Sequence, residues 1–442
     1  MNVIFIVVDD MNDYGFYNTY PGVKMPYLDA YKKTALIFDK AYCPSPVCCP
    51  SRSSFYSGLY PHTTGAYYNG HDGWRKSSIL KNVETIPECF KRNDYITFGR
   101  GKLFHAVVPE ERDSAMWDNY PVYRGGFKPF PEPEDQQFEG NRFFAYKAWK
   151  GPDSDFPDII NTDAAIEFLQ QDHDKPFFLS LGLWRPHTPF TAPKRFFDMY
   201  NIDDMPDTPP GYLENDLDDV PELGKKLVDI WGRFEMAGKN NIELWKEFVM
   251  AYCACNTFVD WNVGRMLDVL QQSPYADDTA VFFFSDNGYH CGEKSHWEKA
   301  TLWEQAARVP LFIRVPGMTP ENISCKRPVN LVDIYPTLIE LCQINKPTHE
   351  MDGNSLVPLF KNPETQWDIP SLTTYGEKYT SLRTEQYHYI QYPDGSGELY
   401  NHNNDTFEFE NIIHDTDYDQ VIKSLEKWIP QKWTPSIGGR NG

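Results

Sequence analysis

The sequence predicts an α/β fold, in which helices flank a large, mostly parallel β-sheet and a small α+β subdomain follows at the C-terminal end. Two observations predict the sheet. Continuously apolar segments rich in Val, Ile and Phe are typical of strands buried on both faces. Helical segments alternate with them along the chain, as in α/β proteins. The third observation is a change to short alternating segments after residue 370, which predicts the subdomain.

Four apolar segments are the predicted strands of the sheet, at residues 2–8, 95–98, 176–182 and 280–285. Each is followed within a few residues by polar side chains. In chain order these are Asp9 and Asp10, Lys102 and His105, Arg185 and His187, and Asp286 and Asn287. Because sites in open α/β sheets form beyond the carboxyl ends of the strands, we expect these groups to converge.

Between the strands, the apolar periodicity predicts helices at residues 161–171, 245–270, 301–307 and 332–341. Two other regions, residues 121–157 and 201–225, are rich in Pro, aromatic and acidic residues and have no clear period. We expect both to be long surface loops that form pocket walls.

The C-terminal part has a different sequence pattern, with short predicted strands in place of long apolar segments. Short strands are predicted at residues 373–375, 387–392 and 398–400, with a turn at 393–397 and a helix at 418–428. We therefore expect a large domain of residues 1–369 and a C-terminal subdomain of residues 370–442, with a short antiparallel sheet.

The bulk composition excludes several classes of protein. The chain has 442 residues and a net charge of -21, so a nucleic-acid partner is not expected, because phosphate binding needs a basic face. No apolar run approaches the roughly 18 residues of a membrane span. The first strand begins almost at Met1, so no signal peptide is expected in this sequence. The nine cysteines lack the paired spacing of a zinc site and leave the redox compartment open.

Residues 48–52, Cys-Cys-Pro-Ser-Arg, place a thiol just before a predicted helix start, since Pro50 suits the first helical turn. A helix N-terminus lowers the pKa of a thiol and favours an anion. Cys48 is therefore a candidate nucleophile facing an anionic substrate. The alternative is that Cys48 and Cys49 are two buried hydrophobic residues or disulfide partners.

Four oxygen ligands follow two of the predicted strands: Asp9, Asp10, Asp286 and Asn287. Carboxylate and amide oxygens suit Ca²⁺ or Mg²⁺ rather than zinc or copper. Either pair alone also fits an ordinary turn, but two pairs that each follow a buried strand favour a metal site. Four further candidates fit surface or structural roles when each is taken alone: Lys102, His105, His187 and Lys299.

Taken together, the motifs resemble those of the formylglycine-dependent sulfatases of the alkaline-phosphatase-like superfamily, over nearly the whole chain. They occur in that family's order: Asp9-Asp10, the Cys48 motif, Gly101-Lys102-x-x-His105, Arg185-Pro186-His187 and Asp286-Asn287-Gly288. The motifs at residues 101–105 and 185–187 are most similar to those of the iduronate-2-sulfatase-like branch, which acts on sulfated uronic acids and related polysaccharide units. The resemblance implies that superfamily's large mixed, mostly parallel sheet.

The resemblance also implies a sulfuric ester hydrolase, periplasmic or secreted, in which a maturation enzyme oxidises Cys48 to formylglycine. It implies one Ca²⁺ ligated by residue 48 with Asp9, Asp10, Asp286 and Asn287. By the same resemblance, Arg52 and Lys102 hold the aldehyde hydrate, and His105 acts as the base. His187 and Lys299 bind the sulfate and assist the leaving oxygen. These residues suit the hydrolysis of a sulfate ester, because a divalent cation activates a bound hydroxyl and an alkoxide leaving group needs an acid.

A sulfated oligosaccharide is the expected substrate. Arg side chains match sugar carboxylates and aromatic rings stack on sugars, which makes these residues candidate contacts: Trp74, Arg75, Arg100, Trp117 and Arg185. Two alternatives stay open, a phosphodiesterase or phosphonate monoester hydrolase that uses the same aldehyde, and a non-catalytic Ca²⁺-bound glycan-binding protein with unmodified Cys48. Pairing of Cys49 with Cys48 or Cys43 would block the modification, and His290 and His296 receive no role.

Overall fold

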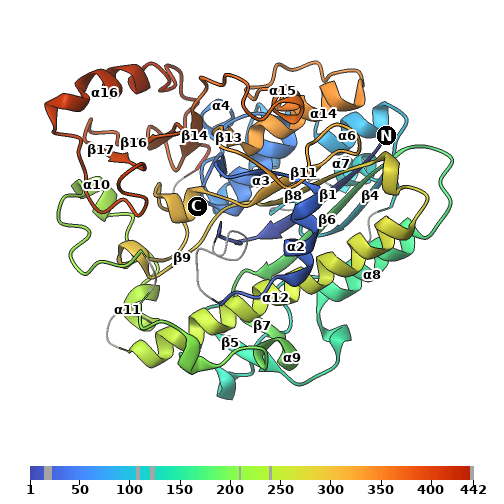
Figure 1. Ribbon diagram of the computed structural model, residues 1–442, viewed down its shortest axis with the longest axis horizontal. Coiled ribbons are helices and arrows are strands. Elements are labelled where there is room, and N and C mark those ends of the chain that lie inside the picture. Colours follow the sequence, from blue (N-terminus) through green and yellow to red (C-terminus); the bar gives the residue numbers. More distant parts are fainter. Residues whose placement is uncertain (14–21, 106–109, 120–124, 209–210, 238–240, 439–442) are drawn as a thin grey trace.

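The computed structural model describes residues 1–13, 22–105, 110–119, 125–208, 211–237 and 241–438. A seven-stranded sheet forms its centre (Figure 1). Its strands, in spatial order, are β12 (Ile323–Cys325), β2 (Leu36–Phe38), β11 (Leu311–Arg314), β8 (Thr279–Ser285), β1 (Asn2–Asp9), β6 (Phe177–Pro186) and β4 (Ile96–Gly101). The four predicted strands, β8, β1, β6 and β4, are adjacent and mutually parallel. β11 runs antiparallel to both its neighbours, so the predicted mixed, mostly parallel sheet is confirmed.

β1 shows why its sequence is continuously apolar. Every residue of the strand is buried, because helices cover both faces of the sheet. Ile4, Ile6 and Val8 belong to a core shared with α8 (Pro157–Leu169) and α12 (Ile242–Gln272). The intervening odd-numbered residues of β1 face the other core. Its helices are α3 (Cys48–Ser57), α6 (Ile86–Arg92), α14 (Ile334–Cys342) and α15 (Val357–Lys361). Figure 1 shows the two helix layers on opposite sides of the sheet.

The remaining helices are short and lie around this three-layer body. They are α2 (Pro26–Tyr31), α4 (Pro61–Thr64), α5 (Gly73–Lys76), α7 (Glu110–Met116), α9 (Lys194–Phe197), α10 (Glu222–Lys225), α11 (Arg233–Ala237) and α13 (Glu304–Ala307). In the part of the chain that the structure describes, every helix is too short or too polar to cross a lipid bilayer.

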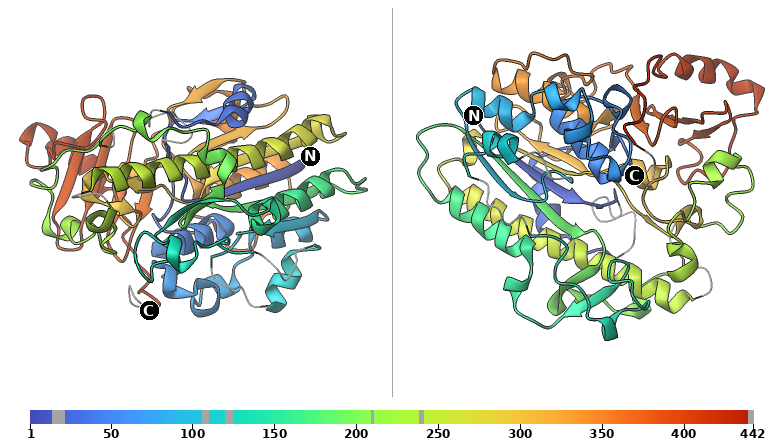
Figure 2. Two further views of the ribbon diagram at one scale, coloured as in Figure 1. Left: turned by 90° about the horizontal axis from the view of Figure 1, so that it is seen from below. Right: turned by 180° about the vertical axis from the view of Figure 1, so that it is seen from behind.

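The C-terminal part forms a separate four-stranded antiparallel sheet, which confirms the predicted short antiparallel sheet. Its strands are β14 (Ser371–Thr374), β15 (Thr380–Arg383), β16 (Tyr387–Gln391) and β17 (Gly397–Asn401), and α16 (Asp419–Glu426) follows. Both views of Figure 2 show this sheet beside the end of the main sheet, at the edge to which the parallel strands point. The predicted domain boundary between residues 369 and 370 stays a prediction.

Several elements differ from the expectation. Residues 146–149, expected in a loop, form β5 (Tyr146–Trp149), which pairs in parallel with β7 (Phe190–Pro193). The helix expected at 301–307 is only the single turn of α13. Nine further strands of the described part of the chain also escaped prediction: β2, β7, β11, β12 and β15, and the two-residue strands β3 (Ala41–Tyr42), β9 (His290–Cys291), β10 (Trp297–Glu298) and β13 (Val329–Asn330). Two-residue strands are too short to show a period. Residues 121–124 of the expected first loop lie outside the described residues.

Candidate active site

The carboxyl ends of the four parallel strands bring the predicted polar residues together. Asp9 ends β1, and Asp10 follows it in the left-handed region at φ 68°. This turn of the backbone places the Asp10 N–H 3.2 Å from Oδ1 of Asp286, just after β8. Tyr252 of α12 donates its hydroxyl proton to the Asp10 carbonyl at 2.8 Å. Both acidic strand ends are therefore fixed in one buried cluster.

Cys48 lies in the middle of this cluster as the first residue of α3. Its Sγ is 3.3 Å from Oδ1 of Asp9 and 3.9 Å from Oδ1 of Asp10, and Nζ of Lys299 is 2.9 Å away. The side chain is 0% exposed, and burial and the Asp9 carboxylate raise the pKa of the thiol well above its usual value. The unmodified thiol is thus a poor nucleophile, despite its place at a helix N-terminus.

Each of the three carboxylates is paired with one cation. Lys102 contacts Asp9, Lys299 contacts Asp10, and Nε of Arg52 donates to Asp286 at 2.7 Å. The six side chains are at most 5% exposed. A buried cluster of this kind is stable only when its charges are matched, and a divalent cation among the three carboxylates would leave the pocket net positive.

The cluster has the features of a cation site. Oxygens of Asp9, Asp10 and Asp286 lie with Sγ of Cys48 within 4.8 Å of one another. Burial raises the pKa of Asp10 to about 7, with Lys299 opposing and Asp9 and Asp286 adding to the effect. Burial also raises the pKa of Asp286, against the opposing charge of Arg52. The Asn287 amide oxygen is buried without a hydrogen-bond partner. Crowded carboxylates beside a free amide oxygen fit Ca²⁺ or Mg²⁺.

Arg52 braces the cluster from α3. Besides Asp286, its guanidinium donates to the backbone carbonyl of Lys102 and, at 3.1 Å, to that of Leu103. Nη2 has no hydrogen bond and lies 3.9 Å from Oδ1 of Asp9. On the same helix, Ser51 Oγ donates to the Asp286 carbonyl at 2.5 Å. α3 is therefore bound to the ends of both β4 and β8.

Lys102 reaches Asp9 through a close approach of two backbones. The Lys102 N–H donates to the Gly182 carbonyl at 2.9 Å. A Cβ at Gly182 would lie 1.8 Å from the Lys102 carbonyl oxygen, and Gly101 has φ +71°. Only glycine fits both positions, so this pair of glycines allows β4 to turn its last residues toward β1.

His187 lies near the carboxylate oxygen of Asp10 that Lys299 does not contact. Its Nε2 is 3.5 Å from Oδ2 of Asp10, and its Nδ1 is 2.6 Å from the Thr188 carbonyl. Since a carbonyl can only accept, Nδ1 carries the proton and Nε2 faces the site. The ring of Phe127 lies 4.4 Å from the imidazole. Burial, together with the charge of Lys299, holds the pKa of His187 well below its usual value.

Lys299 is held by a strained loop. The residues on either side of it, Glu298 and Ala300, have φ of 78° and 76°. His296 accepts the N–H of Asp229 at 2.8 Å with one ring nitrogen and contacts the Lys299 carbonyl at 2.7 Å with the other. Positive φ in non-glycine residues persists only where the surroundings impose it, so His296 is a brace for the Lys299 backbone. His290 similarly contacts Oγ1 of Thr301 at 2.7 Å.

The remaining predicted residues lie around the cluster or away from it. His105 is three residues after Lys102 and is exposed. Trp74 and Trp117 are 2% and 4% exposed, and pack on Phe104 and Phe178. The other three are arginines with protein partners: Arg75 near Asp72, Arg100 on Asn119, and buried Arg185 on the carbonyls of Thr191 and Phe127. Contact of these residues with substrate stays a prediction.

Two residues at the site were not predicted. Tyr252 lies mid-helix with no motif around it, and Phe127 lies in a region whose only signal was its composition as a pocket wall. All nine cysteines, which are all within the described ranges, are free thiols. Cys49 therefore forms no disulfide with Cys48 or Cys43, and its N–H donates to the Asn69 side chain at 2.9 Å.

Comparison with known proteins decides the family. A family model described as "Sulfatase" matches residues 1–344. The chain belongs to the sulfatase family. It is thus a sulfuric ester hydrolase, and the resemblance found in its motifs is confirmed. A second model, described as the C-terminal part of N-sulphoglucosamine sulphohydrolase, matches residues 292–434.

Individual relatives extend over nearly the whole sulfatase chain. A sulfatase of Formosa agariphila is 35% identical over 97% of this chain and 86% of its own length. Iduronate 2-sulfatase of Mus musculus is 27% identical over 96% of this chain and 93% of its own length. The phosphonate monoester hydrolase of Agrobacterium radiobacter superposes with a TM-score of 0.77 at 20% identity, over 96% of this chain and 94% of that one. The last comparison confirms the fold alone.

Proposed function

We propose that this sulfatase removes sulfate from a sulfated carbohydrate, using formylglycine derived from Cys48 and one bound Ca²⁺. The observation that carries the proposal is the position of Cys48, in contact with carboxylates from β1 and with Lys299 at the centre of a matched set of buried charges. A side chain there that carried oxygen in place of sulfur would lie beside the proposed cation ligands.

The proposed metal ligands are the three carboxylates and the amide oxygen of the cluster, Asp9, Asp10, Asp286 and Asn287. When bound, Ca²⁺ supplies polarisation of the sulfate, and an aldehyde at position 48 supplies, as its hydrate, a nucleophilic hydroxyl. The chain's own cations then act on the substrate. Lys102 and Lys299 are within hydrogen-bond reach of the cluster and stabilise charge on the non-bridging sulfate oxygens.

Proton transfer is assigned to Lys299 and His105, with His187 beside the leaving oxygen. The Nδ1–H of His187 is bound to the Thr188 carbonyl, so Nε2 is the atom available to substrate. Because the neutral His187 ring carries no proton on Nε2, the proton passed to the departing sugar oxygen comes from Lys299, whose pKa, despite burial, the neighbouring carboxylates raise, and His187 Nε2 accepts a hydrogen bond there. His105, which is exposed four residues beyond the end of β4, is the proposed base for release of sulfate. Arg52 acts mainly as a brace, because two of its donors are occupied by backbone carbonyls.

The carbohydrate assignment is supported by relatives. One matching protein of Formosa agariphila is named an ulvan-active sulfatase, and it is 26% identical over 98% of this chain. Another matching structure contains its substrate D-glucosamine-2-N,6-O-disulfate. We propose a periplasmic or secreted location and a separate maturation enzyme, both on family resemblance.

Two measurements test this function. Peptide mass spectrometry across residues 48–52, on protein from its native host, should show Cys48 as formylglycine; an unmodified thiol would favour a glycan-binding protein without catalysis. The protein should also cleave 4-nitrophenyl sulfate in preference to an aryl phosphodiester. The opposite preference would favour the phosphonate or phosphodiester hydrolase.

A further inference from the structure

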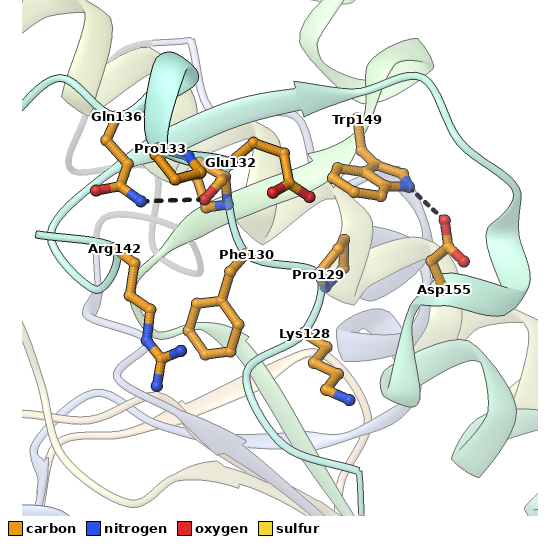
Figure 3. A pocket seen from close by; sticks show the side chains of 10 residues that line it. Lys128, Pro129, Phe130, Glu132, Pro133, Gln136, Arg142, Trp149 and Asp155 are labelled. Carbon is orange, nitrogen blue, oxygen red and sulfur yellow. Dashed lines mark hydrogen bonds between the residues drawn. The ribbon is translucent and has the colours of Figure 1, made fainter. Parts of the chain in front are cut away.

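A surface cavity of about 460 Å³ lies outside the charged cluster, in the region expected to form a pocket wall. Its lining comes from the segment 128–136, from Arg142, from Trp149 at the end of β5 and from Asp155. Figure 3 shows the side chains of Pro129, Phe130 and Trp149 pointing into the same space. Neither the acidic cluster nor the proposed proton transfers use these residues.

The cavity offers fixed aromatic faces. Trp149 is half-buried, and its Nε1–H donates to Oδ2 of Asp155 at 2.8 Å, which fixes the orientation of the indole. Phe130 is half-buried between buried Pro129 and Pro131. Rigid aromatic rings with one open face are suited to the apolar faces of sugar rings, and they lose little conformational entropy on binding.

The cavity also has a cationic side. The guanidinium of Arg142 lies 4.7 Å from the centre of the Phe130 ring, and both Arg142 and Lys128 are exposed. Figure 3 shows these two side chains on the side of the cavity away from the carboxylate of Glu132. Arg recognises a carboxylate or sulfate through a planar pair of donors, so this side favours an anionic sugar.

The cavity is continuous with the catalytic cluster along the chain. Phe127, whose ring contacts that of His187, immediately precedes Lys128. Its carbonyl accepts from Arg185 at 2.8 Å, which ties this segment to the end of β6. Three residues from Phe127 to Phe130 span at most about 10 Å. A linear oligosaccharide with one sulfate beside His187 can therefore reach the cavity with a sugar further along.

We propose that this cavity binds an acidic sugar of the substrate that lies one or more residues away from the sugar being desulfated, stacked on Trp149 and Phe130 with its anionic group toward Arg142 and Lys128. The proposal rests on the proposed function, because it assumes a carbohydrate substrate. It makes the protein selective for oligosaccharides over small sulfate esters.

The test compares three substrates: 4-nitrophenyl sulfate, a sulfated uronate–rhamnose disaccharide and the corresponding hexasaccharide. The wild type should show a higher kcat/KM for the hexasaccharide than for the disaccharide. Trp149→Ala and Arg142→Gln should each lower kcat/KM for the hexasaccharide about tenfold, which corresponds to about 1.4 kcal/mol of binding. In both variants, kcat/KM for 4-nitrophenyl sulfate should stay within twofold of the wild-type value.

Matched controls remove similar groups elsewhere. Trp428, 45% exposed, and Lys175, at the opposite end of β6, are outside the cavity. Trp428→Ala and Lys175→Gln should leave the length dependence unchanged. Trp149→Phe keeps an aromatic ring if the alanine variant fails to fold. Persistence of the hexasaccharide preference in both Trp149→Ala and Arg142→Gln, or in Arg142→Gln alone if Trp149→Ala does not fold, would overturn the proposal.

Calorimetric titration with the desulfated hexasaccharide tests sugar binding in the cavity separately from the proposed sulfatase function. Binding that is weakened by Arg142→Gln in a protein that cleaves no sulfate ester would support the cavity and refute the proposed function. Cleavage of sulfate esters with no length dependence, and no binding of the desulfated hexasaccharide, would refute the cavity and leave the proposed function intact.

Discussion

Glu408 is the centre of a buried polar network between the C-terminal sheet and the segment that carries Lys299. Its Oε1 accepts from Nδ1 of His388 and, at 2.9 Å, from Nε2 of His402. Its Oε2 accepts the Glu304 N–H at 3.2 Å. The side chain is 0% exposed. We predict that Glu408→Gln destabilises the protein measurably while it keeps the shape of the side chain.

The expected loss is about 2–4 kcal/mol in the free energy of unfolding at pH 7, because hydrogen bonds to a charged group contribute about 1.5–3 kcal/mol each. A glutamine oxygen can still accept from the histidines, without the charge. Its amide nitrogen, however, would face the Glu304 N–H, donor against donor. A total stability of about 5–15 kcal/mol leaves the variant folded.

The difference should depend on pH. Burial alone raises the pKa of Glu408, but His388 and His402 outweigh it and hold that pKa well below its ordinary value of 4.5. A depressed carboxyl pKa contributes stability that is present above the unfolded value and is lost as the pH falls toward the folded value. The gap between wild type and Glu408→Gln should therefore narrow below about pH 4.5.

Urea unfolding at pH 7 and pH 4 measures both effects. Glu410→Gln is the matched control, because Glu410 is exposed on the same segment, and substitutions of this kind usually stay within about 0.5 kcal/mol. A Glu408→Gln variant as stable as Glu410→Gln at pH 7, or a gap that widens at pH 4, would refute this account of the network.

Three further predictions concern the candidate active site. Lys102→Met removes the cation on Asp9 and should lower kcat for 4-nitrophenyl sulfate about 10²–10³-fold; a kcat within threefold of wild type would contradict the assigned role. Ca²⁺ at a hundred times its dissociation constant should stabilise the wild type by about 2.7 kcal/mol in thermal unfolding. Asn287→Leu should weaken that stabilisation, and an unchanged response would exclude Asn287 as a ligand. His296→Leu leaves the Asp229 N–H and Lys299 carbonyl unpaired, at about 1–3 kcal/mol each; an unchanged melting temperature would count against the brace.

The sequence predicted the active-site strands because burial on both faces leaves a strong signal. The apolar runs of β1 and β8 end where their polar residues begin, and parallel pairing puts Val8 opposite Ser285. Once those two strands are neighbours, Asp9 and Asp286 must lie close together. The convergence of the acidic residues could therefore be predicted from local pattern and one topological rule.

The pairing of charges could not be predicted in the same way. Lys299 is fixed by Glu298 and Ala300 in positive φ and by a contact with His296, none of which has a periodic signal. Trp74 and Trp117 are compatible with sugar stacking by residue type, but the structure buries them. A sequence records which side chains are present, whereas exposure depends on contacts between distant segments.

The burial of Cys48 bears on the order of events during synthesis of the protein. Its thiol is 0% exposed and is closed in by Lys299, which is 251 residues further along the chain. Ribosomes add about 5–20 residues per second, so the chain that completes this enclosure emerges about 13–50 s after Cys48. Any catalyst that oxidises the thiol has its access during that interval, before the later strands fold over it.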